Sequence, residues 1–296
     1  MSWIIYSLLA VSTFSFVNIF DKFFIGKKLK SPYSFVLILN IFYFIFYLGY
    51  FLIFRSTFVI NPLIVWSILS GLLYFFMWIF WFKALSGGEA SRVTAVFFSQ
   101  PIFTSILAVI FLAETVSPLK WMATVLIVIG AILSSRETGK TKSTFNMAYF
   151  YAILAALFSA VGGVVSKYAT VHTPTLTVSA IGYFFTLPLY FIFLKNRSIF
   201  KEVRSFFSER KLMITMFFRS GLSYAAICFF MLALGSGKVS LVAALNGSQP
   251  LFVLILSTLT SVFFPKILKE EISRQALIYK TVSVILIVTG AIIISI

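Results

Sequence analysis

The chain has 296 residues, of which 60% are hydrophobic and 11% are charged, and its mean hydropathy is +1.04. Soluble domains carry about a quarter charged residues, so this composition excludes a soluble globular protein. The formal charge of +16 would suggest nucleic acid for a soluble chain. Here the Lys and Arg lie between apolar runs, where they act as topology signals, and we expect no nucleic-acid partner.

Ten apolar runs follow one another along the chain, each about 18 residues or longer and so able to cross a ~30 Å hydrocarbon core as a helix. They cover residues 3–24, 33–54, 62–84, 92–113, 118–135, 147–168, 175–194, 212–234, 239–263 and 275–295. The first run lacks a basic leader and a small-residue cleavage site, so we take it as a span rather than a signal peptide. The basic link 195–211 is expected to include a surface helix. The sequence therefore predicts an all-α, integral multi-pass membrane protein of the cell (inner) membrane.

An internal repeat divides the chain. Residues 84–107 and 233–256 are identical at 12 of 24 positions without a gap, far more than shared apolar composition explains. Similar flanking segments make each half five spans long. The predicted organisation is a first repeat over 1–136, a polar linker over 137–146 and a second repeat over 147–296. Because five is odd, the second half is expected to be inverted, as in many transporters that work by alternating access.

Basic residues predict the orientation of the chain. Of the 24 Lys and Arg, 19 lie in the odd-numbered links or at their helix ends. The positive-inside rule places these links in the cytoplasm and both termini outside.

Two glutamine-proline pairs occupy equivalent positions inside the fourth and ninth runs. Pro101 and Pro250 each free a backbone carbonyl one turn earlier, which is tolerated at membrane depth beside protein or water. Gln100, Gln249 and Asn246, one turn before Gln249, are therefore candidate substrate-binding residues at two helix kinks. The alternative is that the kinks serve packing and that the amides bond neighbouring helices.

Arg219 is the strongest single signal. It lies inside the eighth run with no acidic residue within a turn, and a central arginine costs about 2.5 kcal/mol or more unless it faces protein or water. It is therefore a candidate to bind an anionic group of a substrate. The alternative is that its run begins later and that Arg219 snorkels to the surface.

Further candidates rest on single positions. Polar or aromatic residues inside the runs that are expected to complete a substrate site are Asn18, Tyr74, Trp78, Tyr183 and Tyr224, although most aromatic residues here serve packing or interface belts. Charged residues near run ends that are gate candidates are Lys22, Lys167, Glu89 and Arg92, with snorkelling or local ion pairs as the alternative. Glu114 is expected to cap an interfacial turn.

The remaining residue types exclude other chemistry. With one histidine and one cysteine, neither a metal site built on these side chains nor a catalytic centre is expected, and we expect no enzyme, metal or cofactor. The fifth and tenth runs carry Gly130-Ala131 and Gly290-Ala291, which indicates helices that face lipid or form a homodimer.

The pattern resembles the drug/metabolite transporter superfamily, specifically its EamA-like ten-span branch. The resemblance rests on the small residues before the fourth run, the two prolines, the glutamates Glu114 and Glu270 or Glu271, and Gly130 and Gly290. It implies a central cavity between spans one to four and six to nine. It also implies a secondary active transporter (permease) for small metabolites such as amino acids or organic anions. The alternative is a flippase for a lipid or a lipid-linked sugar. Family members commonly have cytoplasmic termini, which differs from the orientation that the basic residues favour.

Overall fold

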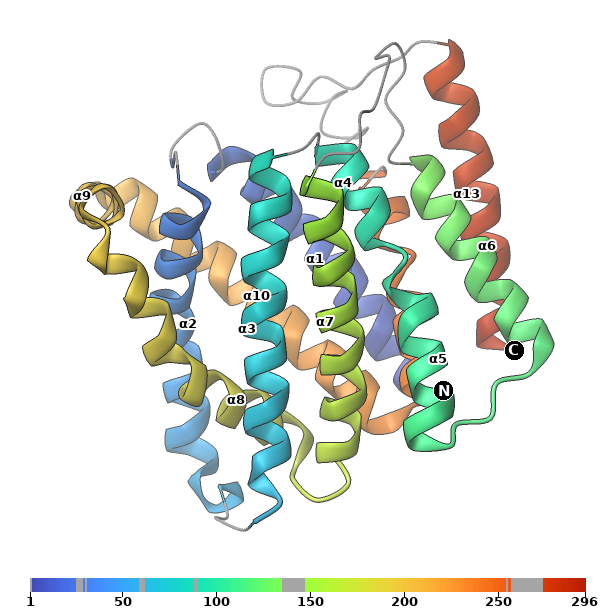
Figure 1. Cartoon of the computed structure of the whole chain (residues 1–296), viewed down its shortest axis with the longest axis horizontal. Coiled ribbons are helices and arrows are strands. Elements are labelled where there is room, and N and C mark those ends of the chain that lie inside the picture. Colours follow the sequence, from blue (N-terminus) through green and yellow to red (C-terminus); the bar gives the residue numbers. More distant parts are fainter. Residues whose placement is uncertain are drawn as a thin grey trace.

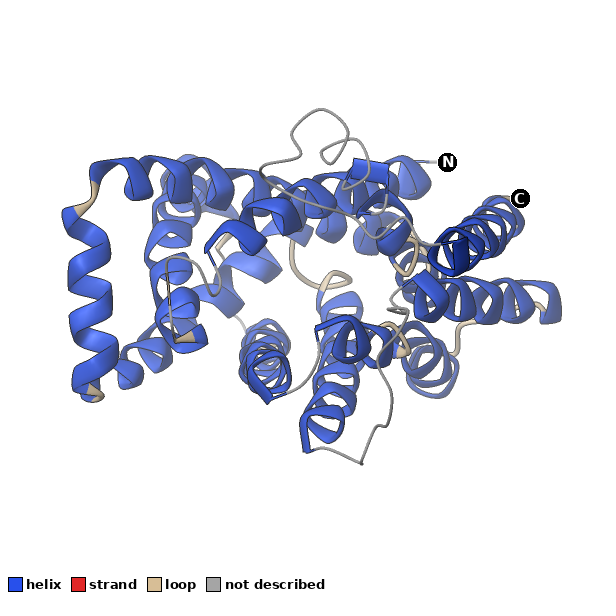
Figure 2. Ribbon diagram, turned by 90° about the horizontal axis from the view of Figure 1, so that it is seen from above, coloured by secondary structure: helices blue, strands red, loops and turns tan. Residues whose placement is uncertain are grey.

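The computed structural model describes residues 2–24, 29, 31–58, 62–87, 90–134, 147–253, 255–256 and 274–296, and within them it contains helices and no strand (Figures 1 and 2). The α-helices are α1 (Ser2–Phe24), α2 (Pro32–Phe54), α3 (Ile64–Gly87), α4 (Ala90–Phe97), α5 (Gln100–Leu112), α6 (Pro118–Ser134), α7 (Met147–Ala169), α8 (Thr175–Tyr190), α9 (Arg197–Ser208), α10 (Arg210–Ser236), α11 (Val239–Asn246) and α13 (Arg274–Ser295). Short 3₁₀ helices, Arg55–Thr57 and Phe191–Lys195, extend α2 and α8.

Six helices of the described part are long and apolar enough to cross a membrane: Pro32–Thr57, Ile64–Gly87, Met147–Ala169, Thr175–Lys195, Arg210–Ser236 and Ile278–Ser295. Shorter apolar helices cover Ser2–Asn18, Gln100–Leu112, Pro118–Leu133 and Val239–Val253. Helices suit this sequence because apolar surroundings offer backbone groups no water, so each N–H and C=O must find a partner within its own segment. The chain is an integral multi-pass membrane protein.

The predicted surface helix is present as α9, which is seen end-on in Figure 1 and so crosses the direction of the long helices. Ile199, Val203 and Phe206 share its buried face, as a three-to-four-residue spacing requires. The Ser34 hydroxyl donates to Oε2 of Glu202 at 2.6 Å. This bond fastens α9 to the first turn of α2.

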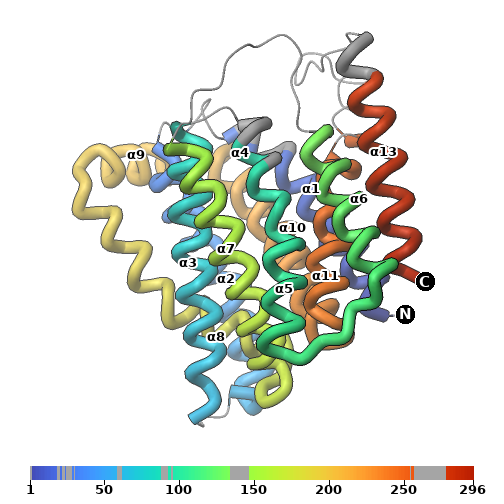
Figure 3. Tube along the Cα trace, turned by 45° about the vertical axis from the view of Figure 1, so that its right-hand side comes forward, coloured from blue at the N-terminus to red at the C-terminus, as the bar shows by residue number. Residues whose placement is uncertain are grey.

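Contacts between the two sequence halves form the centre of the bundle. Helix α1 packs along α10, and α3 packs along α7. Since α1 is equivalent to α7 in the repeat and α3 to α10, these two contacts are equivalent to one another. Helices α6 and α13 form a separate pair at one edge, side by side in Figures 1 and 3. The interface between the halves therefore lies inside the bundle.

Glycines bring two pairs of helices into close contact. A Cβ added to Gly71 of α3 would lie 2.5 Å from the backbone of Gly182 in α8. At the edge pair, a Cβ on Gly130 would lie 2.7 Å from Ile287, and one on Gly290 would lie 2.6 Å from Ile127. The small-residue faces of α6 and α13 thus contact one another within one chain, and the contact of these helices with lipid or with a second copy stays a prediction.

Replacing Gly182 by alanine is expected to lower the free energy of unfolding by about 1–3 kcal/mol, because overpacking forces helices apart. The matched control is Gly49→Ala in α2, where an added Cβ meets nothing within 4 Å and the better helix former should be neutral or slightly stabilising. Thermal unfolding in mild detergent measures both. Equal stability of the two variants would contradict a tight contact between α3 and α8.

Candidate functional site

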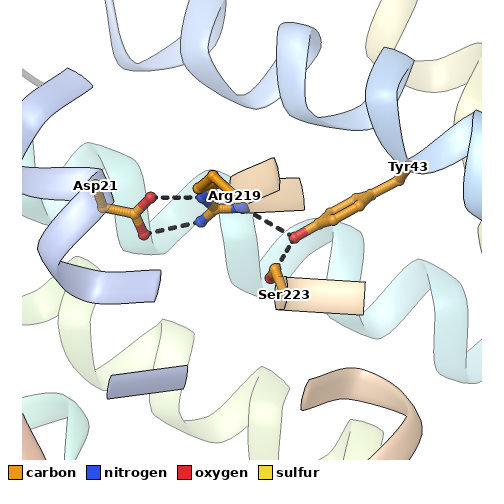
Figure 4. Close-up of polar contacts among 4 residues, drawn as sticks. All are labelled: Asp21, Tyr43, Arg219 and Ser223. Carbon is orange, nitrogen blue, oxygen red and sulfur yellow. Dashed lines mark hydrogen bonds and ion pairs between the residues drawn. The ribbon is translucent and has the colours of Figure 1, made fainter. Parts of the chain in front are cut away.

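A buried ion pair joins α1 to α10. Nε of Arg219 donates to Oδ1 of Asp21 at 2.7 Å and Nη2 donates to Oδ2 at 2.8 Å (Figure 4). This two-pronged geometry is the strongest form of charge-assisted hydrogen bond. The Arg219 side chain is 3% exposed and that of Asp21 is 22% exposed.

Two hydroxyl groups complete the surroundings of the guanidinium. Nη1 of Arg219 donates to the Tyr43 hydroxyl of α2 at 3.1 Å, and that hydroxyl lies 2.6 Å from the hydroxyl of Ser223 (Figure 4). Since the Tyr43 oxygen accepts from arginine, its own proton is free to bond Ser223. We call Asp21, Tyr43, Arg219 and Ser223 the charged cluster. The guanidinium also lies over the Phe35 ring, 5.5 Å from its centre, within the range of a cation–π contact.

The structure corrects two interpretations of Arg219. It does not snorkel to the surface, because it is buried and α10 begins nine residues before it. It also has a carboxylate partner, Asp21, which lies on another helix 198 positions away in sequence. An arginine inside a membrane helix is stabilised when an opposite charge faces it, and here the chain itself supplies that charge.

Three tyrosines continue the site by one helical turn. Tyr47 stacks on Tyr183 of α8 with ring centres 4.2 Å apart, and it meets Tyr224 of α10 edge-on at 4.9 Å. The Tyr183 hydroxyl donates to the backbone oxygen of Asn40 at 2.5 Å. We call Tyr47, Tyr183 and Tyr224 the tyrosine cluster. Tyr47 follows Tyr43 by one turn of α2, so the two clusters adjoin along this helix.

The proline positions interrupt helices in both halves. Helix α4 ends at Phe97 and α5 begins at Gln100, while α11 ends at Asn246 and helical structure resumes at Gln249. Both interruptions meet across the halves, because a Cβ on Gly247 would lie 3.2 Å from the ring of Pro101.

The side chains of Gln100 and Asn246 at these interruptions bond within their own helices. Nε2 of Gln100 donates to the Thr104 hydroxyl at 3.3 Å, and Nδ2 of Asn246 donates to the Val242 oxygen at 2.9 Å. The backbone oxygen of Gln249 accepts from the Ser15 hydroxyl at 3.4 Å. None of these bonds brings an amide to the charged cluster.

The other predicted residues are spread over the bundle. Tyr74 packs on Gly162 of α7, and Trp78 stacks on Phe82 within α3. Asn18 is half-buried in α1. Glu89 and the side chains of Lys22 and Arg92 lie outside the described residues. Nζ of Lys167 donates to the Leu234 oxygen at 2.7 Å.

Glu114 makes the cap that the sequence suggested, and it does so across the two halves. Its carboxylate accepts from the backbone N–H of Val239 at 2.7 Å and of Ser240 at 3.1 Å, and from the Ser240 hydroxyl at 2.6 Å. A carboxylate at a helix N-terminus satisfies amides that lack a partner within the helix. Glu114 therefore fixes the start of α11.

Sequence reasoning missed Asp21, Tyr43, Tyr47 and Ser223 as members of the site. One signal was available, because Asp21 is the only acidic residue within the ten apolar runs. Among the described residues, no group of three or more His, Cys, Asp or Glu could hold a metal ion.

Breaking the ion pair should destabilise the protein asymmetrically. Asp21→Asn leaves a buried cation without its carboxylate and is expected to cost about 3–5 kcal/mol, more than Arg219→Gln, which leaves the partly exposed Asp21. The double variant D21N/R219Q should recover much of the loss. A double-mutant cycle by thermal or denaturant unfolding measures the coupling, with the exposed Arg210→Gln as control. Simple additivity of the two single losses would contradict the pair.

Comparisons with known proteins agree with this architecture. A solved crystal structure matches the fold with a TM-score of 0.71, covering 99% of this chain and 96% of its own, at 17% identity. Curated relatives include the S-adenosylmethionine uptake transporter of Rickettsia prowazekii, 28% identical over 191 residues, which are 60% of this chain and 59% of the relative. The transporter of the same name from Rickettsia bellii is 30% identical over 135 residues, which are 41% of this chain and 45% of the relative.

The chain thus spans about half the length of the curated relatives it matches. The family match is far more complete, because the profile of the EamA-like transporter family fits residues 1–136 and 146–296. The family whose profile fits is one of transporters. This chain belongs to the EamA-like transporter family.

Proposed function

We propose that the protein is a secondary active transporter that moves S-adenosylmethionine, or a metabolite of the same build, by alternating access. The family match supports a transporter, and the names of the relatives support this substrate. The same names support uptake as the direction.

The proposed architecture is ten membrane crossings in two inverted five-helix repeats. Helix lengths support it, since the 23 residues of α1 reach about 34 Å and the 17 of α6 about 26 Å at 1.5 Å per residue. The broken pairs, α4 with α5 and α11 with the helical residues 249–253, each count as one crossing. Tryptophan, tyrosine and lysine at helix ends help shorter helices match the bilayer.

The observation that carries the substrate proposal is the continuity of the charged and tyrosine clusters. S-adenosylmethionine combines an adenine ring, a sulfonium cation and an amino-acid group with both charges. Tyr224 is the half-buried member of the tyrosine cluster, and its ring suits stacking on adenine and cation–π contact with the sulfonium. Asp21 and Arg219 suit the ammonium and the carboxylate of the amino-acid end. The two adjoining clusters thus offer a partner for each part of this molecule.

The paired state of Arg219 also ranks the substrates that the sequence suggested. A simple organic anion would have to take Arg219 from Asp21 and leave that carboxylate without a partner. A molecule with an amino-acid end replaces both charges at once. We therefore favour a substrate containing an amino-acid group over an organic anion.

A binding experiment separates these contributions. Purified protein is titrated with S-adenosylmethionine, with 5′-methylthioadenosine, which lacks the amino-acid end, and with methionine, which lacks the nucleoside. Thermal stabilisation reports binding, because a ligand that binds only the folded state raises its stability. Tyr224→Leu is expected to weaken both nucleosides about tenfold, a loss of about 1.4 kcal/mol. The double variant D21N/R219Q should weaken S-adenosylmethionine but leave 5′-methylthioadenosine unchanged.

The matched control is Tyr149→Leu in the first turn of α7, outside the tyrosine cluster, which should leave every affinity unchanged. Uptake of labelled S-adenosylmethionine into proteoliposomes then tests transport directly. Stabilisation only by a lipid-linked compound, with no response to the soluble panel, would overturn the proposal in favour of a flippase. An equal loss for all ligands in Y224L and Y149L would also reject it.

A further inference from the structure

The N- and C-termini lie at the same end of the bundle (Figures 1 and 3). Residues near both termini line a pocket there. It has a volume of about 760 Å³ and is lined by the ends of seven helices from both halves, α1, α5, α6, α7, α10, α11 and α13. Trp3 forms part of its wall and packs directly on Gly237. Trp3 and Asp21 are 18 residues apart on α1, about 27 Å along the helix axis, so this pocket is separate from the charged cluster.

Three lysines from different elements surround the pocket. Lys120 belongs to the first turn of α6, Lys167 to the last turn of α7, and Lys238 directly precedes α11. The even-numbered links between the apolar runs and their helix ends, which the sequence places on this side of the membrane, carry these three lysines and one further basic residue, Arg55. A face that is otherwise poor in basic residues thus gathers nearly all of them around one pocket.

The one acidic side chain in the lining, Glu114, offsets one of the three lysine charges, so the side chains of the lining keep an excess of two positive charges. The carboxylate of Glu114 accepts hydrogen bonds from Val239 and Ser240 at the start of α11, where the helix dipole favours an anion. Lys167 donates to the backbone oxygen of Leu234, and Lys238 donates to both the backbone oxygen and the hydroxyl of Thr115. An ammonium has three donors, so each retains capacity for a ligand. Within the described part of the chain, no carboxylate pairs with Lys120.

The rest of the lining is largely apolar, with Trp3, Leu112, Leu241 and Ile294 among its members. Three lysines that line one pocket from different elements suit a compact anion with several oxygens, and lysine is a common phosphate ligand. A carboxylate has only two oxygens and fits three separate donors less well. We propose that this pocket binds a phosphate-bearing anion, whose phosphate meets Lys120, Lys167 and Lys238.

The position of the pocket allows two sources for that phosphate. Its rim includes the end of α13 and the start of α6, the edge pair whose outer residues Leu119 and Met122 are exposed, so the headgroup of an anionic lipid can reach it from the bilayer. Free phosphate can reach it from water. The phosphate is common to both, and the experiment separates the two sources.

The test measures thermal stability of the purified protein in a neutral detergent at constant ionic strength. The probes are inorganic phosphate, a short-chain phosphatidylglycerol and the matching phosphatidylcholine, whose headgroup has no net charge. At least one of the first two should raise the unfolding temperature, and K120Q/K238Q should weaken that probe's half-maximal effect at least fivefold. The control K201Q/K211Q removes two exposed lysines from α9 and α10 and should leave the effect unchanged.

Stabilisation by phosphate alone would identify a soluble anion, and stabilisation by phosphatidylglycerol alone would identify a lipid headgroup, and either supports the site. No stabilisation by either probe would overturn it. The same holds for equal stabilisation by phosphatidylcholine, or for an effect that K120Q/K238Q retains in full. The single variant Lys120→Gln leaves the hydrogen bond between Lys238 and Thr115 intact. It therefore repeats the test if the double variant fails to fold.

Discussion

The ion pair between Asp21 and Arg219 is the interaction on which the centre of this bundle depends. A guanidinium that is 3% exposed inside an apolar helix is tolerated only with an opposite charge and hydrogen-bond acceptors around it. Asp21 and Tyr43 supply both. Because the partners come from α1, α2 and α10, satisfying one side chain fixes three helices relative to one another.

The pair also makes the two halves unlike. The repeat aligns Asp21 with Ser166 and Arg219 with Leu69. The ion pair between α1 and α10 therefore has no equivalent between α7 and α3, where both of these positions are uncharged. There Gly162 permits close packing against Tyr74. Under the proposed function, this single ion pair between related halves would give a substrate one preferred orientation. The tyrosine cluster adjoins the ion pair, because its members belong to α2, α8 and α10.

Polar links between the halves occur toward opposite ends of the bundle. Near the end that carries α9, Asp21 of the first half holds Arg219 of the second. Near the end that carries the termini, Glu114 of the first half caps α11 of the second. Any rocking of one half against the other must stretch or exchange at least one of these links. Under the proposed function, a substrate with both charges of an amino acid would replace the first link while the second persists, and this difference would couple substrate binding to the motion.

The helices could be predicted from the sequence because their cause is local, whereas the partners in the site could not be found by the same reasoning. Apolar length and terminal polar residues determine where α2, α7 and α10 begin and end, and these agree with the predicted runs to within a few residues. The partner of Arg219, in contrast, lies 198 positions away, and periodicity along one helix contains no information about it. Electrostatics alone narrows the choice, since a buried cation requires an anion and Asp21 is the only acidic residue in the apolar runs. Scarcity of charge within the membrane thus makes a long-range contact deducible where helix patterns cannot.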